Sequence, residues 1–255
     1  MIRIRPQSKN REQWMRIAKQ EDLFYEVKEL SVPPMLGGDA EDVRRCTDWY
    51  GADGKVKALH GAFIGVDPAS GDPMIASISR QRCRESCELA AELGAEQVIF
   101  HTGAHPFQRG KSLESWAQLC GGFYAKLAQE YRHLTICIEN SSDLDPEPLE
   151  LLVRYANQRV KICLDIGHAQ YSGTPLDVWF SRLGDYIGCL HLSDNRGRFY
   201  DHLPLGEGAV NWIEADRLYK QIGREIPLTI EADTVTDVIE SLKFLRRNRY
   251  FGVRR

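Results

Sequence analysis

The chain has 255 residues, of which 43% are hydrophobic and 27% are charged. This length and balance allow one large core, and they exclude a disordered chain and a small disulfide-stabilised scaffold. The formal net charge is -3, although five arginines lie among the last ten residues, and this charge argues against a protein that mainly grips nucleic-acid backbones.

The sequence has no targeting or membrane signal. No run of about 18 apolar residues is present, the mean hydropathy is -0.39, and the basic N-terminus lacks an apolar signal core. We therefore expect a soluble, cytoplasmic protein without a membrane partner. The seven cysteines form no CxxC pair and lie mostly inside apolar runs, which is typical of reduced thiols.

Short apolar runs rich in β-branched residues alternate with longer segments of helical period. The predicted strands are residues 2–5, 24–30, 56–63, 97–102, 135–140, 160–166, 187–193 and 227–232. The clearest predicted helices are residues 74–93, closed by Gly94, then 112–132, a helix that starts at Pro146 or Pro148, and 235–247.

No linker or composition shift divides the chain, and about 250 residues is the usual size of one (β/α)8 barrel. An open doubly wound sheet is the competing architecture, but no phosphate-binding glycine motif follows the first strand. We therefore predict an α/β fold in which residues 1–255 form a single (β/α)8 TIM barrel domain. Its active site is expected at the carboxyl ends of the strands.

The third to the eighth predicted strands each end in a side chain of a type that binds metal ions. These residues are His60, His101, Glu139, Asp165, His191 and Glu231. A lone His after a strand is usually a hydrogen-bonded core or loop residue, whereas buried carboxylates are costly unless paired, hydrogen-bonded or bound to a cation. The last four of these residues therefore predict an N/O site suited to Mn, Mg, Co, Zn or Fe(II).

Three cysteines sharpen this geometry, because Cys137, Cys163 and Cys189 each lie two residues before a predicted ligand. Residues i and i−2 share one face of a strand, so we expect the thiols to fill the layer directly beneath the site. A buried three-thiolate site is the alternative, but packing explains these cysteines without a metal.

Three loops extend the predicted site. His168 lies three residues into the loop after the sixth strand, and His202 is the favoured functional residue of the Gly-rich, charged loop after the seventh strand. The acidic residues of that loop fit turn chemistry equally well. Arg109 and Lys111, after the fourth strand, are candidate contacts for a substrate phosphate or carboxylate, with solvated loop charges as the alternative.

These segments resemble the xylose isomerase-like TIM barrels, which unite sugar (phosphate) isomerases and epimerases with the endonuclease IV type of apurinic endonuclease. The resemblance covers residues 56–232 and rests on the order and spacing of seven segments. They are LHGAF, ELGAEQVIFHTG, ICIEN, KICLDIGHA, HLSDN, DHLPLGEG and LTIEAD.

The isomerase and epimerase branch of this resemblance implies one divalent metal that stabilises an enediolate. The ligands that it implies are Glu139, Asp165, His191 and Glu231. It further implies that Glu139 and Glu231 are the acid/base pair and that His168 orients a substrate hydroxyl. Our first hypothesis is therefore a metal-dependent isomerase or epimerase of a sugar, a sugar phosphate or a related keto-polyol.

The endonuclease branch implies up to three metal ions, a bridging Glu139 and hydrolysis of a phosphodiester. The extra ligands that it implies are His60, His101, His168 and His202. The chain departs from this pattern, because Tyr200 stands where an aspartate is expected two residues before His202 and Asp201 is adjacent instead. No basic or aromatic insertion for duplex DNA is evident, so nucleic acid is the less expected partner. A catalytically silent binding barrel is a third hypothesis.

Overall fold

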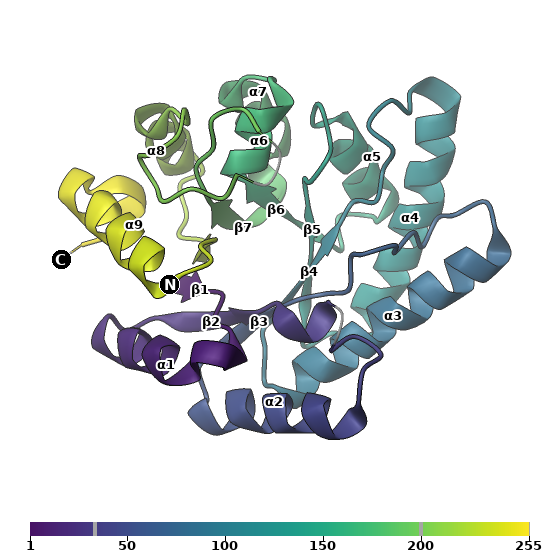
Figure 1. The fold of residues 1–255 in the computed structure, drawn as a ribbon. Helices are drawn as coiled ribbons and strands as arrows, with labels where there is room; N and C mark the ends of the chain where they lie inside the picture. Colours follow the sequence, from purple (N-terminus) through teal and green to yellow (C-terminus); the bar gives the residue numbers. More distant parts are fainter. Residues whose placement is uncertain (33–34, 199–200, 255) are drawn as a thin grey trace.

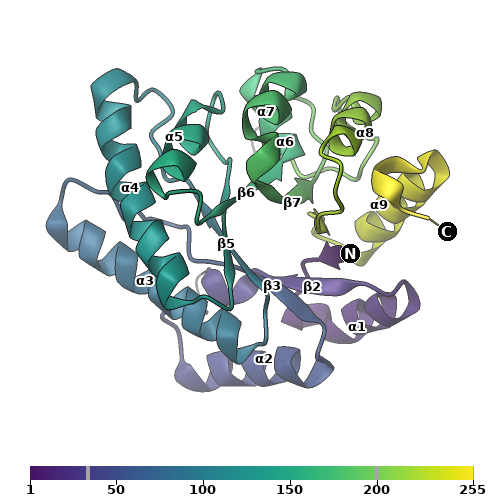
Figure 2. The same ribbon diagram turned by 180° about the vertical axis from the view of Figure 1, so that it is seen from behind.

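The computed structural model describes residues 1–32, 35–198 and 201–254. Eight parallel strands form a closed barrel in chain order, and β1 pairs with β8 to close it. Helices surround the ring of strands (Figures 1 and 2). The predicted (β/α)8 barrel is confirmed, while the assignment of residues 1–255 to one domain stays a prediction.

Every strand ends one to three residues before its predicted end. The strands are β1 (Ile2–Ile4), β2 (Phe24–Val27), β3 (Val56–His60), β4 (Gln97–His101), β5 (Thr135–Glu139), β6 (Lys161–Asp165), β7 (Ile187–Leu192) and β8 (Leu228–Ile230). The apolar run continues past the strand because the next element is also buried. Leu30, for example, belongs to the 3-10 helix η2 (Glu29–Ser31), and Ile166 begins a helix.

The helices follow the expected alternation. They are α1 (Arg11–Gln20), α2 (Ala40–Asp53), α3 (Pro73–Glu92), α4 (Gly110–Glu130), α5 (Glu147–Tyr155), α6 (Ile166–Ser172), α7 (Leu176–Leu183), α8 (Trp212–Gln221) and α9 (Val235–Asn248). Side chains cap several of them, as Asp72 does when it accepts from the backbone N–H groups of Met74 and Ile75. Across the described ranges, every helix is too short or too polar to span a lipid bilayer.

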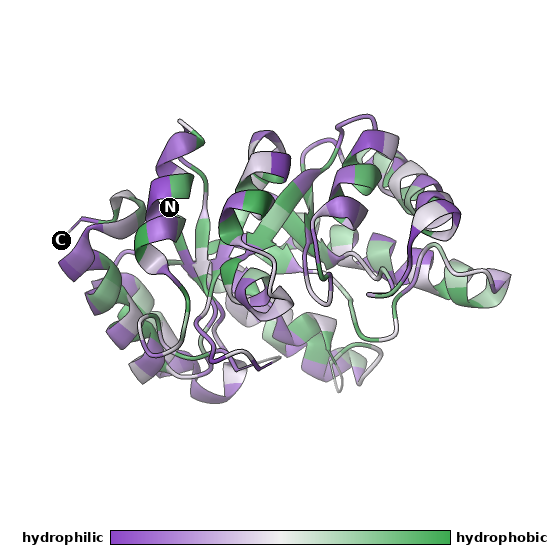
Figure 3. Ribbon diagram, turned by 90° about the horizontal axis from the view of Figure 1, so that it is seen from above, coloured by the Kyte–Doolittle hydropathy of each residue, from purple (hydrophilic) through white to green (hydrophobic). Residues whose placement is uncertain are grey.

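The hydrophobic core has two parts. The larger part lies between the outer faces of the strands and the helices and includes the buried Trp14 and Trp179. Figure 3 shows the strands mostly in the hydrophobic colour, whereas the helices mix hydrophobic and hydrophilic residues. The smaller part fills the inside of the barrel and consists of Ala58, Ile99, Cys137, Cys163 and Cys189, all fully buried. The three thiols therefore pack as a layer, as predicted.

A polar network crosses the inside of the barrel beside that layer. Arg3 donates from Nε to Thr229 Oγ1 at 2.9 Å and from Nη1 to Gln97 Oε1 at 2.6 Å. Thr229 Oγ1 in turn donates to Glu26 Oε2 at 2.7 Å. These contacts join β1, β2, β4 and β8, so hydrogen bonds as well as apolar packing hold the barrel interior.

Gly61 directly follows β3 at a crowded point, where a Cβ would lie 2.2 Å from Cε1 of Phe100. We expect Gly61→Ala to lower the free energy of unfolding by about 1–3 kcal/mol, because the closed core cannot give way. Gly51→Ala is the control, since outside its own stretch of helix no atom of the described chain lies within 4 Å of that Cβ, and replacing a helical glycine should add about 0.5–1 kcal/mol. Urea denaturation measures both, and an unchanged midpoint for Gly61→Ala would contradict this packing.

Candidate active site

The structure brings the six predicted strand-end side chains to one end of the barrel. Four end their strands, His191 is the penultimate residue of β7, and Glu231 directly follows β8. The four are His60, His101, Glu139 and Asp165. Because all the strands are parallel, their carboxyl ends share one rim. The register adds to this convergence by pairing His101 with Glu139 and Asp165 with His191 on neighbouring strands.

A first group of side chains fits a metal ion. Glu139, Asp165, His191 and Glu231 offer ligand atoms that all lie within 4.8 Å of one another. His191 Nδ1 lies 2.8 Å from Glu231 Oε1 and 3.4 Å from Glu139 Oε1. All four side chains are at most 2% exposed, so solvent water cannot satisfy their charges.

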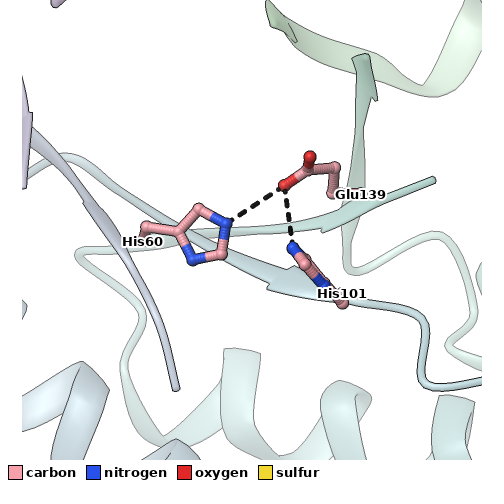
Figure 4. Close-up of side chains that lie close together, drawn as sticks. All are labelled: His60, His101 and Glu139. Carbon is pink, nitrogen blue, oxygen red and sulfur yellow. Dashed lines mark ion pairs between the residues drawn. The ribbon is translucent and has the colours of Figure 1, made fainter. Parts of the chain in front are cut away.

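A second group shares Glu139 with the first. Glu139 Oε2 lies 3.3 Å from His60 Nε2 and 3.6 Å from His101 Nε2 (Figure 4). Its other oxygen, Oε1, lies 3.4 Å from His191 Nδ1 and 3.5 Å from His168 Nδ1. One oxygen of the Glu139 carboxylate therefore faces His60 and His101, and the other faces His191 and His168.

His168 corrects one sequence prediction, because it lies in the short helix α6 and not in a loop. Asp165 begins this helix as its N-cap and accepts from the backbone N–H of His168 at 2.7 Å. His168 Nδ1 also lies 2.8 Å from the carbonyl oxygen of Asn140, which fixes the ring beside Glu139. The helix starts within the DIGH segment. Asp165 is therefore both the last residue of β6 and the N-cap of α6, and His168 lies in the first turn of that helix.

His202 reaches the site from the loop between β7 and α8, and its Nδ1 lies 3.2 Å from Glu231 Oε2. The loop is shaped by Asp194, a fully buried carboxylate that accepts from the backbone N–H groups of Gly206 and Val210 and from Trp212 Nε1. Asp201 accepts from the backbone N–H of Arg196 at 3.0 Å, which is turn chemistry. Tyr200 lies outside the described residues.

The buried charges shift one another's pKa values. Burial opposes ionisation of Glu139, but the positive charge of the His191 ring outweighs burial and holds the Glu139 pKa well below its usual range. Burial raises the Asp165 pKa to about 6. The negative charges of Glu231 and Glu139 raise this pKa further, and together with burial they outweigh the opposite effect of His168. Burial lowers the His101 pKa to about 3, so this ring is neutral at pH 7 and offers a lone pair.

Each residue of the first group keeps one buried atom without a hydrogen bond in the described part of the chain. These atoms are Glu139 Oε2, Asp165 Oδ2, His191 Nδ1 and Glu231 Oε1. The short contact between His191 Nδ1 and Glu231 Oε1 does not have the angles of a hydrogen bond. Unsatisfied polar atoms are costly in a protein interior, and a divalent cation bound by the first group would satisfy Asp165 Oδ2, His191 Nδ1 and Glu231 Oε1, whereas Glu139 Oε2 faces His60 and His101.

The sequence analysis missed Glu26, which lies on β2 and is fully buried. Its Oε1 and Oε2 lie 3.0 and 3.1 Å from His191 Nε2, opposite the ring atom that faces the first group. It also missed Arg5, whose Nη1 lies 2.8 Å from Glu231 Oε1. The overlooked signal was charge at alternate positions, Arg3 and Arg5 in the first strand run and Glu26 and Lys28 in the second.

The two candidate anion contacts lie on the surface. Arg109 and Lys111 are exposed, and Arg109 donates from Nη1 to the carbonyl oxygens of Pro106 and Gln108. Arg109 Nη2 lies 3.4 Å from Asp145 Oδ2, so this guanidinium already has partners. A substrate contact by Arg109 or Lys111 stays a prediction.

Comparison with known proteins agrees with this architecture. A family model described as xylose isomerase-like TIM barrel matches residues 21–248. The uncharacterized protein MJ1311 of Methanocaldococcus jannaschii is 27% identical over 207 residues, which cover 74% of this chain and 68% of that protein.

Solved structures share the fold. A D-tagatose 3-epimerase-like protein superposes with a TM-score of 0.75 and 21% identity, over 96% of this chain and 95% of its own. The IolI protein, solved with a binding zinc atom, superposes with a TM-score of 0.72 and 15% identity, over 95% of each chain. Since the family model covers most of its residues, this chain belongs to the xylose isomerase-like TIM barrel family.

Proposed function

We propose that the chain is a divalent-metal-dependent isomerase or epimerase of a carbohydrate. The observation that carries the proposal is the buried group of three carboxylates and one imidazole, each with an atom that lacks a hydrogen bond. The residues that would hold the metal are Glu139, Asp165, His191 and Glu231. Family membership, a D-tagatose 3-epimerase-like neighbour and a zinc-containing neighbour add support.

The proposed chemistry is proton transfer at a carbon next to a carbonyl. A bound divalent cation would act as a Lewis acid that polarises the substrate carbonyl and makes the neighbouring proton more acidic. Glu139 ends β5 and Glu231 follows β8, so their carboxylates enter the mouth from different sides of the barrel. One carboxylate removes the proton and the other returns it, either to the opposite face of the same carbon or to its neighbour.

The other residues orient and support these groups. The contact of His168 Nδ1 with Asn140 holds the imidazole beside Glu139, where it would orient a substrate hydroxyl. His202 contacts the far oxygen of Glu231 and would orient that carboxylate or contact the substrate. Glu26 holds His191 by its Nε2, which directs Nδ1 to the group.

Solvent exchange tests the proposed reaction directly. Metal-loaded protein in D2O should incorporate deuterium next to the carbonyl of at least one compound in a panel of ketoses, ketose phosphates and keto-acids. Glu231→Gln should slow this exchange by about 100-fold or more, because it removes a proton-transfer group. Glu240→Gln, an exposed residue paired with Lys243, is the matched control. If the wild-type protein exchanged no member of the panel, the proposal would be wrong.

Glu26→Gln tests whether the orientation of His191 matters to the metal. We expect the metal dissociation constant to rise about 10–100-fold, because a second carboxylate that orients an imidazole ligand is lost. Glu29→Gln is the control, since Glu29 is held by Ser8 and Tyr50 and touches none of the four ligands. Competition with a fluorescent chelator measures the affinity, and equal affinities for Glu26→Gln and wild type would contradict the role of Glu26.

A second candidate function is phosphodiester hydrolysis of the endonuclease IV type. The two-sided position of Glu139 favours it, because one oxygen faces His60 and His101 while the other faces His191 and His168. Such a carboxylate can bridge two ions. The net charge of -3 opposes duplex DNA as the substrate.

Metal counting separates the two functions. The hydrolase predicts two or three ions per chain by elemental analysis, the loss of at least one ion in His101→Ala, and cleavage of duplex DNA at an abasic site. If wild type and His101→Ala each bound one ion per chain, and the wild-type protein did not cleave abasic-site DNA, this second candidate would be excluded.

A further inference from the structure

The charges around the mouth of the barrel are divided by strand. Strands β3 to β8 end in the imidazoles and carboxylates described above. In contrast, Arg5 directly follows β1 and Lys28 directly follows β2. Side chains two residues apart share a face, so Arg5 is one layer above Arg3 and Lys28 is one layer above Glu26. Because Arg3 and Glu26 both face the barrel interior, Arg5 and Lys28 belong to the mouth.

The ammonium group of Lys28 is partly buried and has no counter-ion among the described residues. Within residues 1–32, 35–198 and 201–254, its Nζ makes no hydrogen bond or ion pair, and it lies 5.3 Å from the centre of the Phe63 ring. Burial lowers the pKa of Lys28 and the charge of Arg5 lowers it further, although the carboxylates of Glu231, Glu139 and Glu26 act against both. An anion beside Lys28 would offset these costs.

A cavity of about 310 Å³ opens between the ends of β1, β2 and β8. Its lining includes Arg5, Gln7, Lys9 and Lys28, together with the apolar Val32 and Ala232. This volume is at the lower end of the range for small-molecule sites.

The acidic residues of the cavity do not cancel its cations. Glu29 accepts from the backbone N–H of Ser8 at 3.0 Å and from Tyr50 Oη at 2.6 Å, so its carboxylate is engaged in the protein. Asp233 is exposed to solvent. Arg5 contacts both the cavity and Glu231, and it therefore connects this cavity to the candidate active site.

We propose that Lys28 and Arg5 form a subsite for an anionic group of the substrate, either a phosphoryl group or a carboxylate. Lys28 supplies the charge that has no partner, and Arg5 stands between the anion and Glu231. The inference rests on the proposed function for the place of the reacting carbons, and it makes the substrate a sugar phosphate or a sugar acid rather than a neutral sugar. It also locates the anion contact at β1 and β2 instead of at Arg109 and Lys111.

Three polyols that carry neither a ketone nor an aldehyde test the subsite by calorimetry on the metal-loaded protein. They are D-glucitol, D-glucitol 6-phosphate and D-gluconate, and the last two distinguish a phosphoryl site from a carboxylate site. We expect one of the two anions to bind about tenfold or more tightly than D-glucitol, because a hydrogen bond between charged groups contributes affinity of this size. Lys28→Met should remove this preference, because it keeps the aliphatic stem and removes the charge. Lys28→Arg should restore most of it.

The control is Lys126→Met, which changes the net charge equally at an exposed position of α4 and should leave the preference intact. The proposal is overturned if the wild-type protein prefers neither anion, or if Lys28→Met keeps the preference. It is also overturned if Arg109→Ala combined with Lys111→Met removes the preference and Lys28→Met does not.

This test is independent of the proposed reaction, because the probes cannot undergo it. If the Lys28-dependent preference is found but no ketose exchanges deuterium, the subsite stands and the isomerase proposal fails. If ketoses and their phosphates exchange equally in both wild type and Lys28→Met, the isomerase proposal stands and the subsite fails.

Discussion

A set of carboxylates lies buried inside one end of the closed barrel, and their need for positive charge organises the residues around them. They belong to Glu26, Glu139, Asp165 and Glu231, and each is at most 2% exposed. Buried carboxylates are costly unless they are paired or bind a cation. Since parallel strands bring their ends to one rim, the barrel places these charges together and cannot separate them without changing the fold.

The protein meets part of this need with its own cations. His191 contacts carboxylates with both of its ring nitrogens. Glu26 lies at Nε2, while Glu231 and Glu139 lie at Nδ1. These carboxylates outweigh burial and hold the His191 pKa well above its usual range. Arg5 contacts Glu231 from the rim, yet both groups of the pair retain atoms without a hydrogen bond in the described chain. The remaining demand for a cation is what a divalent metal would meet, in competition with protons.

Much of the fold and of the ligand set could be predicted from the sequence, because each depends on a local pattern. A polar residue that ends an apolar run identifies a strand end, and this pattern located Glu139 and Asp165. Glu26 was missed because it lies between the apolar Tyr25 and Val27, inside a run that was interpreted as one continuous buried strand. In a barrel, both faces of a strand are covered, so a charge inside the run marks a polar interior layer.

The helix at His168 was missed for a different reason. It has only seven residues, it begins directly at the strand end, and its second residue is Gly167, so it shows no helical period. Tertiary packing explains that glycine, since a Cβ there would lie 2.3 Å from Ser193 Oγ. Such contacts join residues that are distant in sequence, and no local pattern contains them.

Anomalous diffraction from crystals of the Mn-loaded protein tests the central claim most directly. We predict an anomalous peak within coordination distance of Glu139, Asp165, His191 and Glu231, at about 2.0–2.3 Å from their oxygen and nitrogen atoms. The absence of a peak at these four residues, in crystals that contain manganese elsewhere, would contradict the account.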